Sequence, residues 1–267
     1  MVVVAKSSRV RKAKIRRWII YAITLIVLVV LAVTIDWATL QQAFFQPEII
    51  RAMLPEVITV GAKNTIIYTT MAFSFGLVLA LFLALMKRST IAPYRWFATG
   101  FIELFRGLPA LITIILVAFG LPIALGIRVP GGTLGKGTLG LGLVAAAYMA
   151  ETIRAGVEAV PRGQMEAARS LGMTRGKAMM YIILPQAFRI IIPPLTNELV
   201  LLIKDTSLLF VIGTTPLSKE LTKFARDFMT ETQNATPLTV AAIMYLIITL
   251  PLTYLVRRLE KRTNKGR

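Results

Sequence analysis

Long apolar stretches are the feature that most limits what this chain can fold into. Four of them contain no charged residue, at positions 18–35, 65–86, 107–127 and 238–256. A helix of about 20 apolar residues crosses the ~30 Å hydrocarbon core of a bilayer. Hydrophobic residues also make up 56% of the chain, which exceeds the roughly 45–50% of a soluble domain. The sequence therefore predicts a membrane-spanning helical protein.

Two further stretches, 138–157 and 190–213, are apolar but interrupted by charged residues. A charge inside the bilayer costs several kcal/mol unless it is paired or faces water, so these residues need partners or a polar cavity. Counting both stretches as spans, we expect an all-α integral membrane fold with about six transmembrane helices. The charged residues in them are Glu151, Arg154, Glu198, Lys204 and Asp205.

Two couples of opposite charge are spaced for ion pairs within one helix. Glu103 and Arg106 form one couple, and Glu151 and Arg154 form the other. Residues three apart share a helix face, so we interpret both couples as structural pairs near the ends of their spans. Lys204 is followed directly by Asp205, and the side chains of neighbouring residues point about 100° apart on a helix. At least one of those two side chains is expected to face a polar interior.

Basic residues gather in alternate loops, which predicts how the spans are oriented. Cytoplasmic loops carry an excess of lysine and arginine. Here the basic groups lie before residue 18, at 87–95, at 154–189 and after residue 256, whereas the other loops balance acidic against basic residues. We therefore expect both termini on the cytoplasmic side. The basic residues of the first tail are Lys6, Arg9, Arg11, Lys12, Lys14, Arg16 and Arg17.

Composition and motifs argue against several other functions. The net charge of +18 is spread over membrane-flanking loops, so it does not indicate nucleic-acid binding. The chain has no histidine and no cysteine, which excludes Ser-His-Asp catalysis, thiolate chemistry and histidine-ligated metal sites. GKGTLG at 135–140 matches G-x-G-x-x-G, but it follows a glycine-rich loop and no strand. We expect no catalytic site, no metal site and no bound cofactor.

A polar segment at 162–185 separates two of the apolar stretches. Helix-forming residues precede Gly172, which suits a left-handed helix end. Thr174 can then cap a second short helix, and Pro185 marks the end of that helix or a bend in it. A short helix offered to a groove is a common docking element, so we expect this hairpin to contact a partner.

The spacing in this hairpin resembles the EAA loop of ABC importer permeases that work with a binding protein. Glu-Ala-Ala is followed by three residues, Gly, nine residues, Ile, one residue and Leu-Pro, without a gap. The matching positions are Glu166, Ala167, Ala168, Gly172, Ile182, Leu184 and Pro185. Other segments are similar to those of polar amino-acid uptake permeases, and the resemblance covers roughly residues 61–258. These segments are ELFRGLP at 103–109, AYMAETIR at 147–154, Gly163-Gln164, PQA at 185–187 and KDTSL at 204–208.

The resemblance implies a type I ABC importer transmembrane domain with a cytoplasmic coupling hairpin, in the bacterial plasma (inner) membrane. Its implied partners are a second permease, identical or paralogous, two ATPase subunits that use ATP and Mg, an external binding protein that delivers a polar amino acid, and lipid. On this reading the chain is no enzyme, because ATP is hydrolysed by the separate subunits. The ATPase-coupling residues are expected to be Gly163, Gln164, Glu166, Ala167, Ala168 and Gly172.

The charged part of stretch 190–213 can either line a translocation pathway or pack against other helices, and the sequence leaves both open. A carboxylate lining a cavity would suit a cationic amino acid, whereas Lys204 would suit an anionic one. The substrate is therefore undecided at this point. The candidate pathway residues are Asn197, Glu198, Lys204, Asp205, Thr206 and Ser207.

We divide the chain into four segments: a basic tail at 1–17, an extra N-terminal transmembrane helix with an external segment at 18–58, the permease domain at 59–258, and a second basic tail at 259–267. With this extra helix the chain has one span more than the five that are typical of the family the chain resembles. It also imitates a secretory signal, but no A-x-A cleavage site follows residue 35, so we favour a retained helix.

Two other functions are compatible with parts of the sequence. A secondary transporter with Glu198 or Asp205 as its proton or sodium site is physically reasonable, but it leaves the hairpin unexplained. A membrane enzyme acting on lipid would need clustered carboxylates, and the acidic residues are spread over different spans.

Overall fold

The computed structural model describes the backbone of residues 2–264 and the side chains of residues 14–261. The described residues are almost entirely helical and include no strand, in agreement with an all-α membrane fold. The basic residues expected at 6, 9, 11 and 12, and those after residue 261, lie outside the described side chains.

Contacts divide the chain into two compact units, Met1–Pro47 and Glu48–Arg267. This boundary precedes the division that we placed at residue 58. Helix α3 (Pro47–Glu56) lies in the larger unit from Glu48 onward, where Met53 is buried in a cluster with Val57, Leu221 and Phe224.

The smaller unit consists of α1 (Val2–Thr34) and α2 (Trp37–Phe44). The apolar side chains described in α1 are exposed, as suits a helix whose surroundings are lipid. Asp36 caps α2 by accepting hydrogen bonds from the backbone N of Ala38 and Thr39, each at 3.1 Å.

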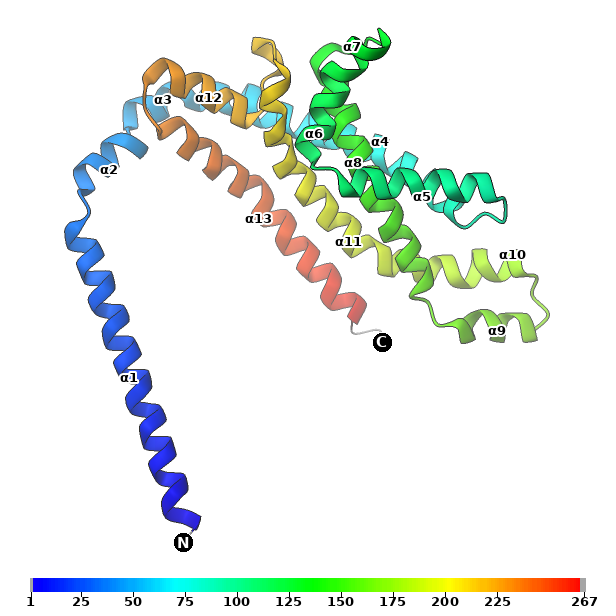
Figure 1. Cartoon of the computed structure of the whole chain (residues 1–267), viewed down its shortest axis with the longest axis horizontal. Coiled ribbons are helices and arrows are strands. Elements are labelled where there is room, and N and C mark those ends of the chain that lie inside the picture. The colour runs from blue at the N-terminus through cyan, green and yellow to red at the C-terminus, as the bar shows by residue number, and fades with distance from the viewer. Residues whose placement is uncertain (1, 265–267) are drawn as a thin grey trace. The chain divides into compact units, whose positions relative to one another are not determined.

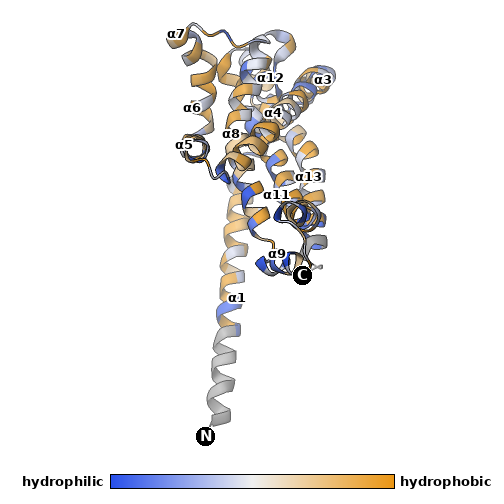
Figure 2. Ribbon diagram, turned by 90° about the vertical axis from the view of Figure 1, so that its right-hand side faces the viewer, coloured by the Kyte–Doolittle hydropathy of each residue, from blue (hydrophilic) through white to orange (hydrophobic). Residues whose placement is uncertain are grey.

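The larger unit is a bundle of helices (Figure 1) in which several spans are interrupted by short π or 3-10 turns. Figure 2 shows hydrophilic residues on α9, whereas α4, α6 and α8 are largely hydrophobic. The helices are α4 (Lys63–Lys87), α5 (Ala92–Gly107), α6 (Ala110–Ile115), α7 (Leu121–Leu125), α8 (Gly132–Glu158), α9 (Arg162–Ser170), α10 (Arg175–Ala178), α11 (Leu184–Asp205), α12 (Leu221–Thr232) and α13 (Thr236–Asn264). The π turns are η1 (Val57–Ala62), η2 (Leu116–Gly120) and η3 (Met179–Ile183), and the 3-10 turns are η4 (Thr206–Ile212) and η5 (Pro216–Ser218).

The apolar stretches expected to span the membrane are largely helical, but the one at 107–127 is broken after Gly107 and leaves helix after Leu125, and the one at 190–213 ends in the 3-10 turn η4. Within the described residues, three helical segments are long and apolar enough to cross a bilayer, Lys14–Thr34, Trp37–Lys87 and Thr236–Lys261. A fourth is Ala92–Gly107 with Ala110–Leu125, if this pair, bent by 110°, forms one span. Helices α8 and α11, which carry the intramembrane charges, are not among these segments.

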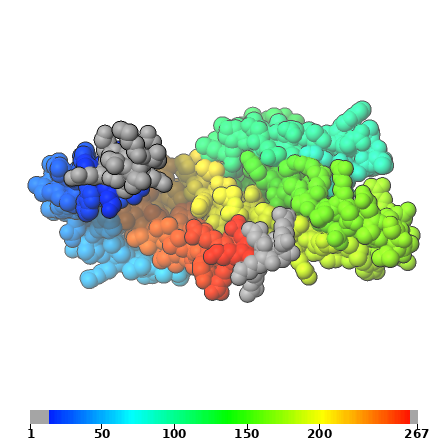
Figure 3. Space-filling view, turned by 90° about the horizontal axis from the view of Figure 1, so that it is seen from below, coloured from blue at the N-terminus to red at the C-terminus, as the bar shows by residue number. Residues whose placement is uncertain are grey.

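Small residues bring α4 and α8 into close contact at the centre of the larger unit. Gly76 on α4 faces Gly142 and Ala145 on α8 so closely that an added Cβ at position 76 would lie 3.0 Å from the Gly142 carbonyl oxygen. Ala72 and Ala146 are fully buried nearby. Helix α11 packs against α8 and α13 and also contacts α4, and Figure 3 shows α13 at the surface seen from below.

Candidate functional site

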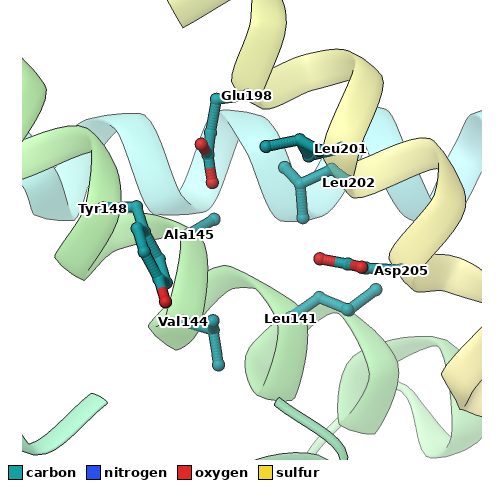
Figure 4. Close-up of a pocket in the computed structure, with 8 residues that line it drawn as sticks. All are labelled: Leu141, Val144, Ala145, Tyr148, Glu198, Leu201, Leu202 and Asp205. Carbon is teal, nitrogen blue, oxygen red and sulfur yellow. The ribbon is translucent and has the colours of Figure 1, made fainter. Parts of the chain in front are cut away.

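A cavity of about 240 Å³ lies between α8 and α11, and Figure 4 shows side chains from both helices converging on it. Most of its lining is aliphatic, and its polar groups are two carboxylates and one phenol. Such a mixture of apolar wall and few polar groups is typical of small-molecule sites. The lining residues are Leu141, Val144, Ala145, Tyr148, Glu198, Leu201, Leu202 and Asp205.

Glu198 and Asp205 reach this cavity because they are seven residues apart on α11. Seven residues make about two helical turns, so both carboxylates lie on the same face, and Figure 4 shows them pointing into the space beside α8. Among the described residues, no basic side chain forms an ion pair with either of them. Both carboxyl groups therefore face the cavity without a basic partner among the described residues.

The other candidate pathway residues are placed differently. Asn197 and Lys204 are exposed and do not line the cavity. Thr206 is buried and donates its hydroxyl hydrogen to the backbone oxygen of Ile203 at 2.6 Å. Ser207 is half-buried, outside the cavity lining. Of the six predicted positions, the structure brings together Glu198 and Asp205.

Tyr148 is a cavity residue that our sequence reasoning missed. It lies in the AYMAETIR segment, whose resemblance was noted without assigning a role to the tyrosine. The Arg106 guanidinium lies 5.5 Å from the centre of the Tyr148 ring, within the range of a cation–π contact. The expected pair between Glu103 and Arg106 is absent from the ion pairs of the described residues. That prediction was wrong because Arg106 is engaged with another helix.

The second expected couple forms an ion pair and extends across two helices. Glu151 accepts hydrogen bonds from Arg154 on its own helix and, at 3.0 Å, from Lys87 Nζ at the end of α4. Arg154 also pairs with Glu158. The side chains of Lys87, Glu151 and Arg154 are each 20–27% exposed, so their mutual neutralisation lets them lie in a partly buried place.

The hairpin formed by α9 and α10 projects from one end of the larger unit (Figure 1). Gly172 ends the first helix with φ +84°, and the backbone N of Gly172 and Met173 donate to the oxygens of Arg169 and Ala168. This confirms the left-handed helix end that the glycine predicted. Thr174 caps α10 by accepting from Lys177 N at 3.3 Å. Pro185 does not end that helix, because the chain continues through η3 and places the proline in the first turn of α11.

The predicted coupling residues divide into an exposed set and a buried one. Gly163, Gln164, Glu166, Ala167 and Gly172 are exposed, whereas Ala168 is buried. Beneath the hairpin lies a cluster that includes Ile183, Ala187 and Ile191. Gln164 Oε1 accepts a hydrogen bond from Gln186 Nε2 at 3.2 Å, which ties α9 to the start of α11.

Leu171 at the hairpin tip is an exposed apolar residue that the sequence reasoning also missed. It is 85% exposed, although it stands in an otherwise polar hairpin. Buried apolar anchors contribute much of the energy of protein interfaces. A leucine directly before the left-handed glycine was the signal in the sequence that could have identified it.

A buried polar group lies away from the cavity, in the segment that leads into α12. Glu220 is fully buried and caps α12. Burial raises the pKa of Glu220 to about 7, although hydrogen bonds from Thr222, Lys223 and Tyr245 oppose the shift. Nearby, burial acts to raise the pKa of Asp227, but hydrogen bonds from Lys219 and Lys223 outweigh it and lower that pKa. Among the described residues, no group of three carboxylates is arranged to hold a metal ion.

Comparison with known proteins agrees with this architecture. The family described as "Binding-protein-dependent transport system inner membrane component" matches residues 76–265. The probable glutamine ABC transporter permease GlnM of Bacillus subtilis is 36% identical over 77% of this chain and 93% of its own length. The arginine transport permease ArtQ of the same organism is 35% identical over 79% of this chain and 95% of its own length.

A solved structure of an amino acid ABC transporter with histidines has a TM-score of 0.73 and 36% identity, covering 80% of this chain and 96% of that one. Members of this family are multi-pass transport subunits that work with ATPases and binding proteins, and they do not themselves hydrolyse ATP. The expected type I importer fold and the expectation that this chain is no enzyme are thereby confirmed. The chain belongs to the family of inner-membrane components of binding-protein-dependent transport systems, the permease subunits of ABC importers.

Proposed function

We propose that this permease subunit passes a cationic amino acid through the cavity between α8 and α11, driven by ATPase subunits that hold the α9–α10 hairpin. The observation that supports this most is the pair of carboxylates, Glu198 and Asp205, in a cavity whose lining includes no basic residue. The relatives named for glutamine and arginine make an amino acid the natural class of substrate.

The position of Lys204 supports the cationic of the two charge classes that the sequence left open. Lys204 lies on the exposed side of α11 and outside the cavity lining. A cation in the cavity would be attracted by two carboxylates in surroundings of low polarity, where charge interactions are stronger than in water. An anionic amino acid would be repelled by the same groups.

The contacts of the hairpin supply a route from the ATPases to the cavity. Met165 of α9 packs against the apolar cluster at the start of α11, and Gln164 bonds to Gln186 on that helix. Helix continues without a break from Arg175 through η3 to Asp205. A displacement of the hairpin is therefore transmitted along the helix that carries Glu198 and Asp205. ATP can bias the permease only if the ATPases hold the hairpin differently in its two states.

The expected assembly contains a second permease, identical or paralogous, two ATPase subunits that use ATP and Mg, and an external binding protein. We place both termini and the hairpin on the cytoplasmic side, since the basic residues gather there, and α12 on the external side. The basic tails at 1–17 and 259–267 would then face anionic lipid. This chain binds no cofactor in the proposal.

Reversing one charge on the hairpin tests the coupling role. Glu166→Lys is expected to reduce ATP-dependent uptake of labelled arginine at least about tenfold, since the exposed carboxylate would face the ATPase and a loss of ~1.4 kcal/mol corresponds to that factor. The measurement uses proteoliposomes that contain the whole complex, supplied with binding protein, with and without ATP on the ATPase side. Glu231→Lys, an exposed charge reversal on α12, serves as the control. Uptake driven by an ion gradient without ATP would instead favour a secondary transporter.

Neutralising the cavity tests the substrate class. Glu198→Gln and Asp205→Asn are each expected to raise about tenfold the concentration of arginine or lysine that half-maximally stimulates the complex, while that of glutamine changes little, because a neutral amide removes most of the charge attraction. The measurement is substrate-stimulated ATP hydrolysis by the complex. Lys204→Gln is the matched control on the same helix and should leave these concentrations unchanged. If arginine, glutamine and glutamate respond alike in all variants, the cationic assignment fails while the importer assignment stands.

A further inference from the structure

One tyrosine hydroxyl stands between the buried Glu220 and the end of α11. Glu220 Oε1 accepts from Lys223 N at 2.7 Å, and Oε2 accepts from Thr222 N at 2.5 Å. Tyr245 on α13 donates its hydroxyl hydrogen to the same Oε2 at 3.1 Å. The Tyr245 oxygen also lies 3.2 Å from Thr222 Oγ1 and 3.5 Å from Thr206 Oγ1. Thr206 follows directly on Asp205 of the cavity.

Counting hydrogens shows that these contacts cannot all be hydrogen bonds at once. The hydroxyl hydrogen of Tyr245 is given to Glu220, and that of Thr206 is given to the Ile203 oxygen at 2.6 Å. Each hydroxyl has one hydrogen. With Glu220 ionised, Tyr245 and Thr206 therefore face each other without a hydrogen between them, at the outer limit of hydrogen-bond distance.

A proton on Glu220 would change this arrangement. The protonated Oε2 can donate to the Tyr245 oxygen and still accept from Thr222 N. Tyr245 then accepts from Glu220 and Thr222, and its own hydrogen is released toward Thr206 Oγ1. We propose that Glu220, Tyr245 and Thr206 form a relay in which protonation of Glu220 creates a hydrogen bond between α13 and the end of α11.

The groups around Glu220 allow this carboxyl to titrate near neutral pH. Tyr68 on α4 and Tyr245 on α13 are the nearby phenols, and Lys219, Lys223 and Asp227 are the charged neighbours. Both lysines are engaged with Asp227, and within the described residues no cation pairs with Glu220. Burial sets the pKa of Glu220 at about 7. The carboxyl is therefore mainly neutral below that pH, with the relay formed, and mainly ionised above it, with the relay broken.

The consequence for transport rests on the proposed function. If the cavity is the pathway and α12 lies outside the membrane, an external proton stiffens the attachment of α11 directly beside Asp205. Thr65 adds a second tie at the start of α12, because its Oγ1 accepts from Leu221 N at 3.2 Å. The start of α12 is thus attached to α4, α13 and, through Tyr245, the end of α11.

A double-mutant cycle tests the relay without substrate or ATPase. Tyr245→Phe and Thr206→Val each remove one hydroxyl, and their shifts in thermal unfolding midpoint are compared with the shift of the double variant of the full chain in detergent. At about pH 5.5 the double variant is expected to lose less than the sum, because both changes remove the same bond. At about pH 8.5, above the pKa of Glu220, the two shifts are expected to add.

Tyr254→Phe provides the matched control, because Tyr254 is an exposed tyrosine on the same helix. Combined with Thr206→Val, it should give additive shifts at both pH values. Equal coupling of Tyr245 and Thr206 at both pH values, or no coupling at the lower one, overturns the relay. Because unfolding requires no transport, either result is independent of the proposed function.

Discussion

Gly76→Val is expected to lower the free energy of unfolding by about 3 kcal/mol, which is the upper part of the usual range for overpacking a core. A Cβ at this position would lie 2.8 Å from Met149 Cε and 3.0 Å from the Gly142 carbonyl oxygen. The methionine end can move aside, but the carbonyl belongs to the backbone of α8. Helices α4 and α8 would have to separate, and the apolar groups between them would lose their contacts.

The measurement is the unfolding midpoint of the purified chain in detergent. Gly100→Val on α5 is the matched control, since nothing lies within 4 Å of a Cβ at that position and valine has a somewhat higher helix propensity than glycine. The control should be neutral or slightly stabilising. A similar loss in both variants would mean that the damage comes from valine in a helix and that the contact between α4 and α8 is unimportant.

Glu151→Gln is the second change with a large expected effect, a loss of about 3 kcal/mol, as for removing one partner of a buried ion pair. The carboxylate neutralises both Lys87 and Arg154. Without it, two cations remain in a partly buried place, with Glu158 as the remaining acidic partner of Arg154. The cost arises from the stranded cations more than from the lost attraction.

Glu158→Gln is the control for this second change, because the Glu158 side chain is 53% exposed and exposed ion pairs contribute about 0–1 kcal/mol. Chemical unfolding of both variants would compare the two effects directly. The double change Lys87→Met with Glu151→Gln should recover part of the loss, since one of the stranded cations is then absent. A failure of Lys87→Met to help would contradict the assigned pairing.

Features set by local chemistry were predictable from the sequence. The left-handed end at Gly172, the cap at Thr174 and the pair between Glu151 and Arg154 depend on residues within one turn of each other. The positions of the apolar helices were predictable for a similar reason, because the bilayer imposes a length on them. A side chain at position 172 would be strained by φ +84°, although nothing lies within 4 Å of the Cβ position.

Features that depend on how helices pair were not predictable. The cavity needs α8 beside α11, and no pattern within α11 indicated that Tyr148 would face Glu198. Arg106 was assigned to the wrong partner because spacing along one helix does not show what a neighbouring helix offers. The network around Glu220 joins residues from positions 206 to 245, and the sequence alone gave no sign that they meet.

The glycine contact between α4 and α8 also restricts which parts of this permease can move. Where a backbone oxygen faces a glycine with no side chain between them, sliding or rotation soon causes a collision that no rotamer change can relieve. Helix α11 meets α8 through longer side chains such as Leu202, and its partners can adjust. We therefore expect α4 and α8 to move as one unit, so that a change in the width of the cavity comes from a displacement of α11 against them.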